Sequence, residues 1–402
     1  VKLFLRRDTF RRFFSCLVFV PRDKYTTAIR RKIEALLTDA FGGISVDTSV
    51  QISESALARV HIIVRTPDGE RPRISIQKIE QDLAELVVTW SDRLRAEMLK
   101  TYGQDEGEQL FRAYGHIFPA GFQEDTLPAE ACSDVRAIDD MLRDGVCRSV
   151  DLYSANKLND GDLRFIVYSV GQPIALSDAL PVVEEMGSAV YTEHPHECRL
   201  DSGQSFWIQD FHLRHESGTS IDVEAVSERF EECFMAVLAG AAENDGLNRL
   251  IVPAGLTWRQ VTLLRCYAKH ILQLGVPFSQ AYMEDVLVAH ANLANSLVAQ
   301  FEIQFDPSIS RSRRRRELRA IQKKVERGLS KARNVDEDRI LTAFAGGIAA
   351  TLRTNYFLTD DGQPKSSISI KLNPDKLPEV PLPKPKYEIF VYSPEVEGVH
   401  LR

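Results

Sequence analysis

The sequence predicts an α+β fold in which a small module, a strand followed by a helix and two more strands, occurs twice. Three observations lead to this prediction. Short apolar runs rich in β-branched residues alternate with amphipathic stretches in the first part of the chain. The same order of elements returns after an intervening helical stretch. Most of the remaining chain carries apolar residues at three- and four-residue spacing, which is typical of helices packed on a core.

The first module begins with Phe13–Val20, a continuous apolar run that predicts a buried strand. A turn at Pro21-Arg22-Asp23 leads to a helix over about residues 26–37, and Gly42-Gly43 interrupts the chain. Alternating residues then predict strands over residues 45–52 and 59–64. No fourth strand is apparent.

A helical stretch separates the two modules. Apolar residues at helical spacing predict one long helix from about Ser75 to Gly103, and the chain to about Ser154 reads as short helices broken by prolines. The second module follows, with strands predicted at 163–168, 189–192 and 205–213 and helices at 176–186 and about 227–238. A short strand at 250–252 would complete a β-α-β-β-α-β order.

Helices dominate the next part of the chain. Thr257 with Gln260 three residues later predicts a capping box at the start of a helix that Gly275 ends. Further helices are expected over about 279–301, over a very basic segment after Asp306-Pro307, and over about 336–354. A strand at 368–372 and a stiff Pro-rich connector at 378–385 follow.

The last segment, residues 384–402, predicts strands. Tyr387, Ile389 and Val391 alternate with Glu388, Phe390 and Tyr392, so both faces of this strand carry apolar residues and a larger sheet is expected around it. No residues follow to supply that sheet, and the chain begins with a valine. We therefore expect the chain to be a piece of a longer polypeptide.

Composition narrows the class of protein. The 402 residues allow two to four domains, and the net charge of -7 argues against a primary nucleic-acid binder. Six scattered cysteines without a CxxC pair are typical of reduced thiols in cytosol. The arginines before Phe13–Val20 imitate a signal peptide, but the apolar run is short and has no cleavage site. We expect a cytoplasmic protein without a membrane partner.

Two residue clusters have a chemical and a plainer interpretation. His194, His196 and Cys198 share one face of a strand, and with His212 and His215 they suggest a zinc site; an edge strand with solvent-facing histidines is the favoured alternative, and Pro195 makes a regular strand doubtful. The run at 311–316, RSRRRR, suggests nucleic acid or acidic lipid. A solvated helix face that docks on acidic surface of the same protein is favoured, because the chain is acidic overall.

The turn after each first strand is the candidate binding site. Pro21, Arg22 and Asp23 in the first module, and Gly171 and Gln172 in the second, each precede a predicted helix N-terminus. Backbone amides and the helix dipole there favour a carboxylate or another anion. Modules that only mediate subunit packing are the alternative. No catalytic set is predicted, since GxGxxG, GxxxxGK[ST] and GxSxG patterns are all absent. No metal site is predicted, because zinc ligands typically have a tighter, paired spacing.

The chain resembles the large bacterial NAD-specific glutamate dehydrogenases in three stretches that occur in the family's order. These stretches are residues 13–37 (FFSCLVFVPRDKYTTAIRRKIEALL), residues 254–275 (AGLTWRQVTLLRCYAKHILQLG), and the C-terminal segments LRTNYF, SISIKLNP and KYEIFVYSPEVEGVHLR. The resemblance implies that the β-α-β-β units are ACT-like modules that precede a glutamate dehydrogenase catalytic domain. It places the catalytic lysine, the glycine-rich glutamate-binding segment and the nucleotide-binding unit beyond Arg402, so no catalytic or cofactor residue is assigned here.

The resemblance implies five segments. We expect an ACT-like module at 1–72, a helical segment at 73–158, a second ACT-like module at 159–254, a helical segment at 255–345 and the start of the catalytic domain at 346–402. It further implies that the parent enzyme deaminates glutamate oxidatively with NAD and is a homo-oligomer, expected to be a tetramer. These residues themselves are expected to bind no cofactor. A stand-alone amino-acid-sensing scaffold without catalytic activity is the alternative function.

Overall fold

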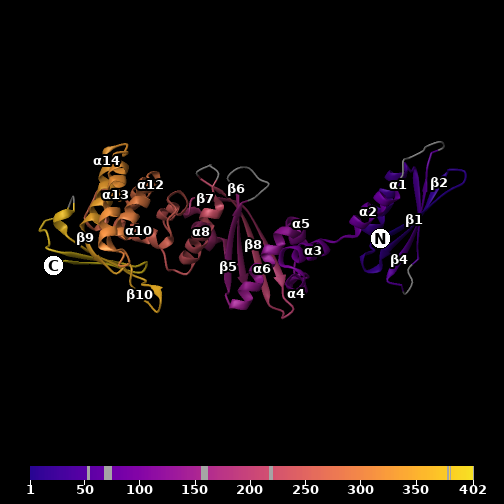
Figure 1. The fold of residues 1–402 in the computed structure, drawn as a ribbon, viewed down its shortest axis with the longest axis horizontal. Coiled ribbons are helices and arrows are strands. Elements are labelled where there is room, and N and C mark those ends of the chain that lie inside the picture. Colours follow the sequence, from indigo (N-terminus) through magenta and orange to yellow (C-terminus); the bar gives the residue numbers. More distant parts are fainter. Residues whose placement is uncertain are drawn as a thin grey trace. The chain divides into compact units, whose positions relative to one another are not determined.

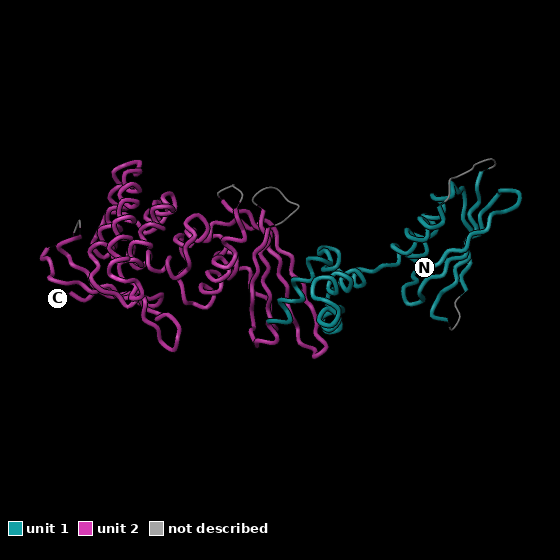
Figure 2. Tube along the Cα trace, in the orientation of Figure 1, with its two compact units in different colours: residues 1–140 teal, residues 141–402 magenta. Residues whose placement is uncertain are grey.

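The structure is a computed structural model that describes residues 1–51, 55–67, 75–154, 162–216, 221–377, 380 and 382–401. The chain divides into two compact units, Val1–Asp140 and Met141–Arg402, coloured separately in Figure 2. The α+β class predicted from the sequence is confirmed. Ile52 of the predicted second strand, and Pro378, Glu379 and Pro381 of the predicted connector, lie outside the described residues.

The first unit begins with a four-stranded antiparallel sheet (Figure 1). Its order is β1-β2-β4-β3, from the strands β1 (Lys2–Arg7), β2 (Phe13–Pro21), β3 (Ser45–Gln51) and β4 (Leu57–Arg65). The short 3-10 helix η1 (Arg22–Lys24) follows β2, and α1 (Thr27–Phe41) and α2 (Ile76–Val87) pack on one face. Alternate residues of β2, such as Cys16 and Val18, are fully buried against α1 residues such as Ile33. The period-two pattern of the sequence thus selects the face that the helices cover.

The first sheet contains a fourth strand that the sequence analysis missed. It is β1, which precedes β2 and pairs with it from Lys2↔Phe19 to Arg7↔Phe14. The strand lies at the sheet edge and exposes Phe4, so its buried face consists mainly of Leu3 and Leu5. A short, charged edge strand of this kind gives almost no apolar pattern.

The helical stretch of the first unit contains four helices among the described residues. They are α3 (Trp90–Tyr102), α4 (Gln104–Tyr114), α5 (Ala120–Asp125) and α6 (Pro128–Asp144), which continues into the second unit. The single helix predicted from Ser75 to Gly103 is wrong, because the chain breaks after α2. Thr89 and Asp92 form a capping box that starts α3, so local capping outweighs the continuous apolar stripe.

The second unit contains a four-stranded sheet with the same topology as the sheet of the first unit. Its strands have the order β5-β6-β8-β7, all antiparallel, and comprise β5 (Arg148–Ser154), β6 (Asp162–Val170), β7 (Ser188–Arg199) and β8 (Ser205–His215). The helices α7 (Leu176–Glu185) and α8 (Val223–Leu238) follow β6 and β8. Phe165 of β6 packs against Phe230 and Phe234 of α8, with ring centroids 5.5 and 4.8 Å apart. Each module therefore has the order β-β-α-β-β-α. The predicted orders, β-α-β-β for the first module and β-α-β-β-α-β for the second, are wrong.

Two further element predictions for this part of the chain are wrong. Residues 148–154, predicted helical, form the edge strand β5, whose buried residues are only Val150 and Leu152. Residues 250–252, predicted as the closing strand, lie in η2 (Gly246–Leu250) and α9 (Ile251–Ala254). A short apolar run does not distinguish a strand from a buried helical turn. Asp245 caps η2 by accepting a hydrogen bond from the Leu247 amide at 3.1 Å, which favours the helical turn.

Five helices then follow, of which α10 (Trp258–Gln273) was predicted most accurately. Its predicted capping box is confirmed: Thr257 N donates to Gln260 Oε1 at 2.9 Å, and Gln260 N donates to Thr257 Oγ1 at 3.3 Å. The others are α11 (Gln280–Ala289), α12 (Ala291–Phe305), α13 (Arg311–Leu329) and α14 (Val335–Ala350). The single helix predicted over 279–301 is wrong, since it breaks at His290 between α11 and α12.

The C-terminal part of the chain forms a third antiparallel sheet. Its order is β14-β13-β12-β9, from β9 (Thr351–Thr354), β12 (Ile368–Leu372), β13 (Glu388–Tyr392) and β14 (Glu397–Leu401). The hairpin of β10 (Thr359–Asp360) and β11 (Gln363–Pro364), and η3 (Pro374–Lys376), lie in the connections. The helix predicted over 336–354 is wrong in its last turn, which is β9. The prediction that residues 387–392 form a strand with both faces buried is also wrong. β13 lies between β12 and β14, but only alternate residues of it are buried, and Val391 is exposed.

Within the described part of the chain, no helix combines the length and apolar character needed to cross a bilayer.

Candidate functional site

The first predicted binding turn lies between β2 and α1. Pro21 is the last residue of β2 and is half-buried, while Arg22 and Asp23 are exposed in η1. The Arg22 amide donates to Ala56 O at 2.9 Å, and Thr26 caps α1 by accepting from the Ile29 amide at 3.2 Å. At least one amide at the start of α1 is therefore already bonded within the chain.

The second predicted turn lies between β6 and α7. Gly171 has a φ of +84°, a left-handed conformation that favours glycine, and its amide donates to Ser205 O at 2.8 Å. Gln172 is exposed. The buried amide side chain of Gln209 clamps the turn, since its Oε1 accepts from Ile174 N at 2.7 Å and its Nε2 donates to Ile174 O at 3.1 Å. α7 starts at Leu176, and its N-cap residue Ala175 provides no side-chain cap, so its first amides keep their capacity to bind an anion.

The five predicted binding residues belong to two units. Pro21, Arg22 and Asp23 lie in residues 1–140, and Gly171 and Gln172 lie in residues 141–402. Of the two turns, the one at Gly171 has the geometry better suited to an anion, because it combines a left-handed glycine with an uncapped helix start.

The histidine cluster lies on β7, where the chain remains a regular strand through Pro195. The doubt raised by Pro195 was therefore wrong; β7 is an edge strand, where proline removes no ladder hydrogen bond that the sheet needs. The rings of His194 and His212 lie 5.7 Å apart. His215 points to the opposite face from His212, because the two are three residues apart on β8. Among the residues that the structure describes, no group of three or more His, Cys, Asp or Glu is arranged to hold a metal ion.

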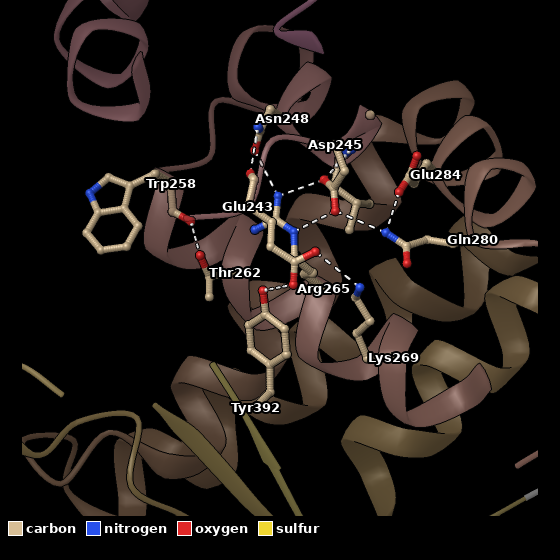
Figure 3. A network of polar contacts seen from close by, with 12 residues as sticks. Glu243, Asp245, Asn248, Trp258, Thr262, Arg265, Lys269, Gln280, Glu284 and Tyr392 are labelled. Atoms are coloured by element: carbon tan, nitrogen blue, oxygen red, sulfur yellow. Dashed lines mark hydrogen bonds and ion pairs between the residues drawn. The ribbon is translucent and has the colours of Figure 1, made fainter. Parts of the chain in front are cut away.

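A buried polar network surrounds Arg265 in the second unit (Figure 3). Arg265 projects from α10 and is fully buried. Its Nε and Nη2 donate to the two carboxylate oxygens of Asp245, each at 2.7 Å, and Nη2 also donates to Asn248 Oδ1 at 2.9 Å. Burial opposes its charge, but these bonds to Asp245 dominate and raise the pKa of Arg265. The guanidinium is thus a permanent cation held by a two-point carboxylate contact.

The network extends to α11 through Gln280. Gln280 Nε2 donates to Asp245 Oδ2 at 3.1 Å and to Glu284 Oε1 at 2.8 Å. Burial raises the pKa of Glu284, although the bond from Gln280 counteracts this. Asp245 therefore links η2, α10 and α11 at a single carboxylate, which explains how three short elements keep a fixed arrangement.

The network also holds strand β13 at both of its ends. Tyr392, the last residue of β13, donates from its hydroxyl to Glu243 Oε1 at 2.8 Å, and Lys269 Nζ lies 3.1 Å from Glu243 Oε2. Glu388, the first residue of β13, lies 3.0 Å through Oε1 from Nε2 of the fully buried His270 on α10. Burial raises the pKa of Tyr392, so its hydroxyl stays a donor.

The Arg265 network holds η2, α10, α11 and β13 in position, and it does not form a catalytic site. Most of its charged side chains are paired with one another, and Glu284 is bonded to the neutral Gln280. Arg265 Nη1 and His270 Nδ1 have no hydrogen-bond partner among the described residues. The sequence analysis missed the network, because Tyr392 and Glu243 are 149 residues apart and Glu388 and His270 are 118 apart. The one available signal was Arg265 itself, a charge beside the predicted apolar stripe of α10.

Known families match the chain in consecutive segments. The matching models are the ACT2 domain of glutamate dehydrogenase at residues 2–91, its helical motif 2 at 97–141, its ACT3 domain at 148–226, its helical motif 3 at 242–307, and the catalytic domain of bacterial NAD-glutamate dehydrogenase at 324–402. Three proteins named NAD-specific glutamate dehydrogenase match over the whole chain: 36% identity in Halomonas elongata, 35% in Pseudomonas aeruginosa and 38% in Mycobacterium tuberculosis.

The chain belongs to the bacterial NAD-glutamate dehydrogenase family. The resemblance identified from the sequence is confirmed. The chain spans about a quarter of the length of these curated relatives.

The polar network joins two of the segments that match the dehydrogenase family. Asp245, Arg265 and Gln280 lie in the segment that matches helical motif 3, whereas Glu388 and Tyr392 lie in the segment that matches the catalytic domain. The hydrogen bonds of Tyr392 and His270 therefore connect a helical motif to the first sheet of the catalytic-domain segment.

Proposed function

We propose that this chain is the regulatory and oligomerisation portion of an NAD-dependent glutamate dehydrogenase. The whole protein would convert L-glutamate to 2-oxoglutarate and ammonium while NAD accepts the hydride, in the cytoplasm. The ordered match of ACT, helical-motif and catalytic-domain models along the chain supports this proposal. We assign no catalytic residue and no cofactor contact to the chain itself.

The proposal keeps the five-segment division, with two changes. We place the start of the second ACT-like module at Arg148 instead of residue 159, because β5 is the edge strand of that module's sheet. We place the end of the first module at Val87 instead of residue 72, because α2 packs on the first sheet. The boundaries at residues 254 and 345 stay.

The activity of the full-length protein is the direct test. With L-glutamate, the full-length protein should reduce NAD to NADH, and it should reduce NADP to NADPH only weakly. The isolated 402-residue chain should form no NADH. A full-length protein that forms no NADH from glutamate would favour the alternative, a stand-alone amino-acid-sensing scaffold.

Within this function, we propose that the turn at Gly171 and Gln172, and the turn at Pro21, Arg22 and Asp23, bind the carboxylate of an amino-acid effector. The uncapped start of α7 and the left-handed glycine support the second turn. The basic face of α13 would dock on acidic surface within a homo-oligomer, expected to be a tetramer. Its exposed Arg315, Arg316 and Arg319 support a docking role, because none of them forms an ion pair with another of the described residues.

Calorimetric titration with a panel of amino acids tests the effector site. Gly171→Ala should weaken effector binding, since alanine resists a φ of +84° and would displace the turn. Gly203→Ala is the matched control: Gly203 has a φ of +80°, and a Cβ there meets nothing within 4 Å. Flat heats for every amino acid, or equal losses in both variants, would leave packing as the role of the modules.

A further inference from the structure

A largely apolar cavity lies between α10, α14 and the loop that joins α10 to α11. Its volume is about 170 Å³. Ile271, Leu274, Phe278, Ile340 and Ala343 supply much of its apolar lining. Cavities of ~150 Å³ lined by such side chains remain dry and accept benzene. This cavity therefore has room for a phenyl-sized group.

One residue of the cavity lining has a buried polar atom without a hydrogen-bond partner among the described residues. His270 lines the cavity and is fully buried, and its Nε2 faces Glu388 Oε1 at 3.0 Å. A carboxylate only accepts hydrogen bonds, so Nε2 carries a proton, and in the neutral imidazole Nδ1 then presents a lone pair. His270 Nδ1 is buried and has no hydrogen-bond partner among the described residues. An unsatisfied buried acceptor is costly and calls for an explanation such as a ligand.

We propose that this cavity binds a small apolar molecule that carries one hydrogen-bond donor, a hydroxyl or a ring N–H, directed at Nδ1 of His270. The apolar body fills the space between α10 and α14, and the donor satisfies the buried acceptor. Asp338 and Arg339 are the charged residues of the lining and are both exposed, so polar substituents of the ligand face them and the solvent.

The ligand would act on the catalytic-domain segment through His270. A donor at Nδ1 holds the imidazole in the tautomer and orientation that donates to Glu388, the first residue of β13. Occupancy thereby favours one position of β13 relative to α10, which makes the cavity a regulatory site. This regulatory role rests on the proposed function, whereas binding itself does not.

The test is a fluorine-NMR titration of the full-length protein with 4-fluorophenol and with fluorobenzene. The two probes have nearly the same shape, and only the first carries a donor. We expect 4-fluorophenol to bind about three- to ten-fold more tightly, the contribution of one net hydrogen bond. Equal affinities, or no binding of either probe, would overturn the proposal.

Two alanines of α14 supply matched variants. Ala343→Leu places three further carbon atoms in the cavity and should abolish binding of 4-fluorophenol. Ala349→Leu adds the same atoms on the exposed face of the same helix and should leave binding unchanged. Binding that survives in the Ala343→Leu protein would also reject the site. A protein that binds the probe but forms no NADH from glutamate would reject only the proposed dehydrogenase and its regulation.

Discussion

Replacing Arg265 with methionine should destabilise the second unit by about 3 kcal/mol. Removing one partner of a buried ion pair typically costs about 3–5 kcal/mol, because the other charge stays buried without compensation. In the R265M protein, Asp245 would lose the Nε and Nη2 contacts but keep the Leu247 amide and Gln280 Nε2, both at 3.1 Å. These two remaining donors place the expected cost at the lower end of the range. Asn248 Oδ1 would also lose a donor.

Thermal unfolding followed by calorimetry measures this loss. For a unit of this size, a loss of about 3 kcal/mol lowers Tm by roughly 6–12 °C. The double variant Asp245→Asn with Arg265→Met removes both charges, so it should be more stable than the sum of the single losses predicts, by about 1–3 kcal/mol. A loss below about 1 kcal/mol in R265M, or strictly additive single and double variants, would refute the view that this pair organises η2, α10 and α11.

Three further outcomes are expected. Thr257→Ala should destabilise the second unit by about 1 kcal/mol in urea unfolding, and Thr257→Ser should not, because serine keeps the capping oxygen; equal losses would contradict the capping role. Only the exposed Cys147 should react rapidly with a thiol reagent at about pH 8. Burial raises the pKa of Cys16 and of Cys233 to about 12 and of Cys132 to about 11, so fast labelling that persists in Cys147→Ser would refute this reasoning. Changing Arg315, Arg316 and Arg319 to glutamate should weaken assembly of the full-length protein in sedimentation, and changing them to lysine should not; unaltered assembly with glutamate would exclude α13 as a docking face.

The elements that the sequence predicted well depend on residues close to one another in the chain. The capping box of Thr257 and Gln260 spans one turn, and the apolar alternation of Phe13–Val20 is complete within the strand itself. The missed elements, β1 and β5, are edge strands with one buried face and few apolar residues. The helix breaks at Val88 and His290 were missed because the apolar residues keep their helical spacing on both sides of each break. Such spacing does not show where one helix ends and the next begins.

The sequence by itself determined the family, the α+β class and the repeated module. The spacing of apolar residues, the helix caps and the order of motifs each depend on residues that are close together in the chain. Only the tertiary structure decided which distant residues share a site. Tyr392 meets Glu243 and Glu388 meets His270 across more than a hundred residues, and the cavity beside His270 exists only where α10 and α14 pack. Such contacts arise from the packing of whole elements, and no local pattern specifies which side chains that packing brings together.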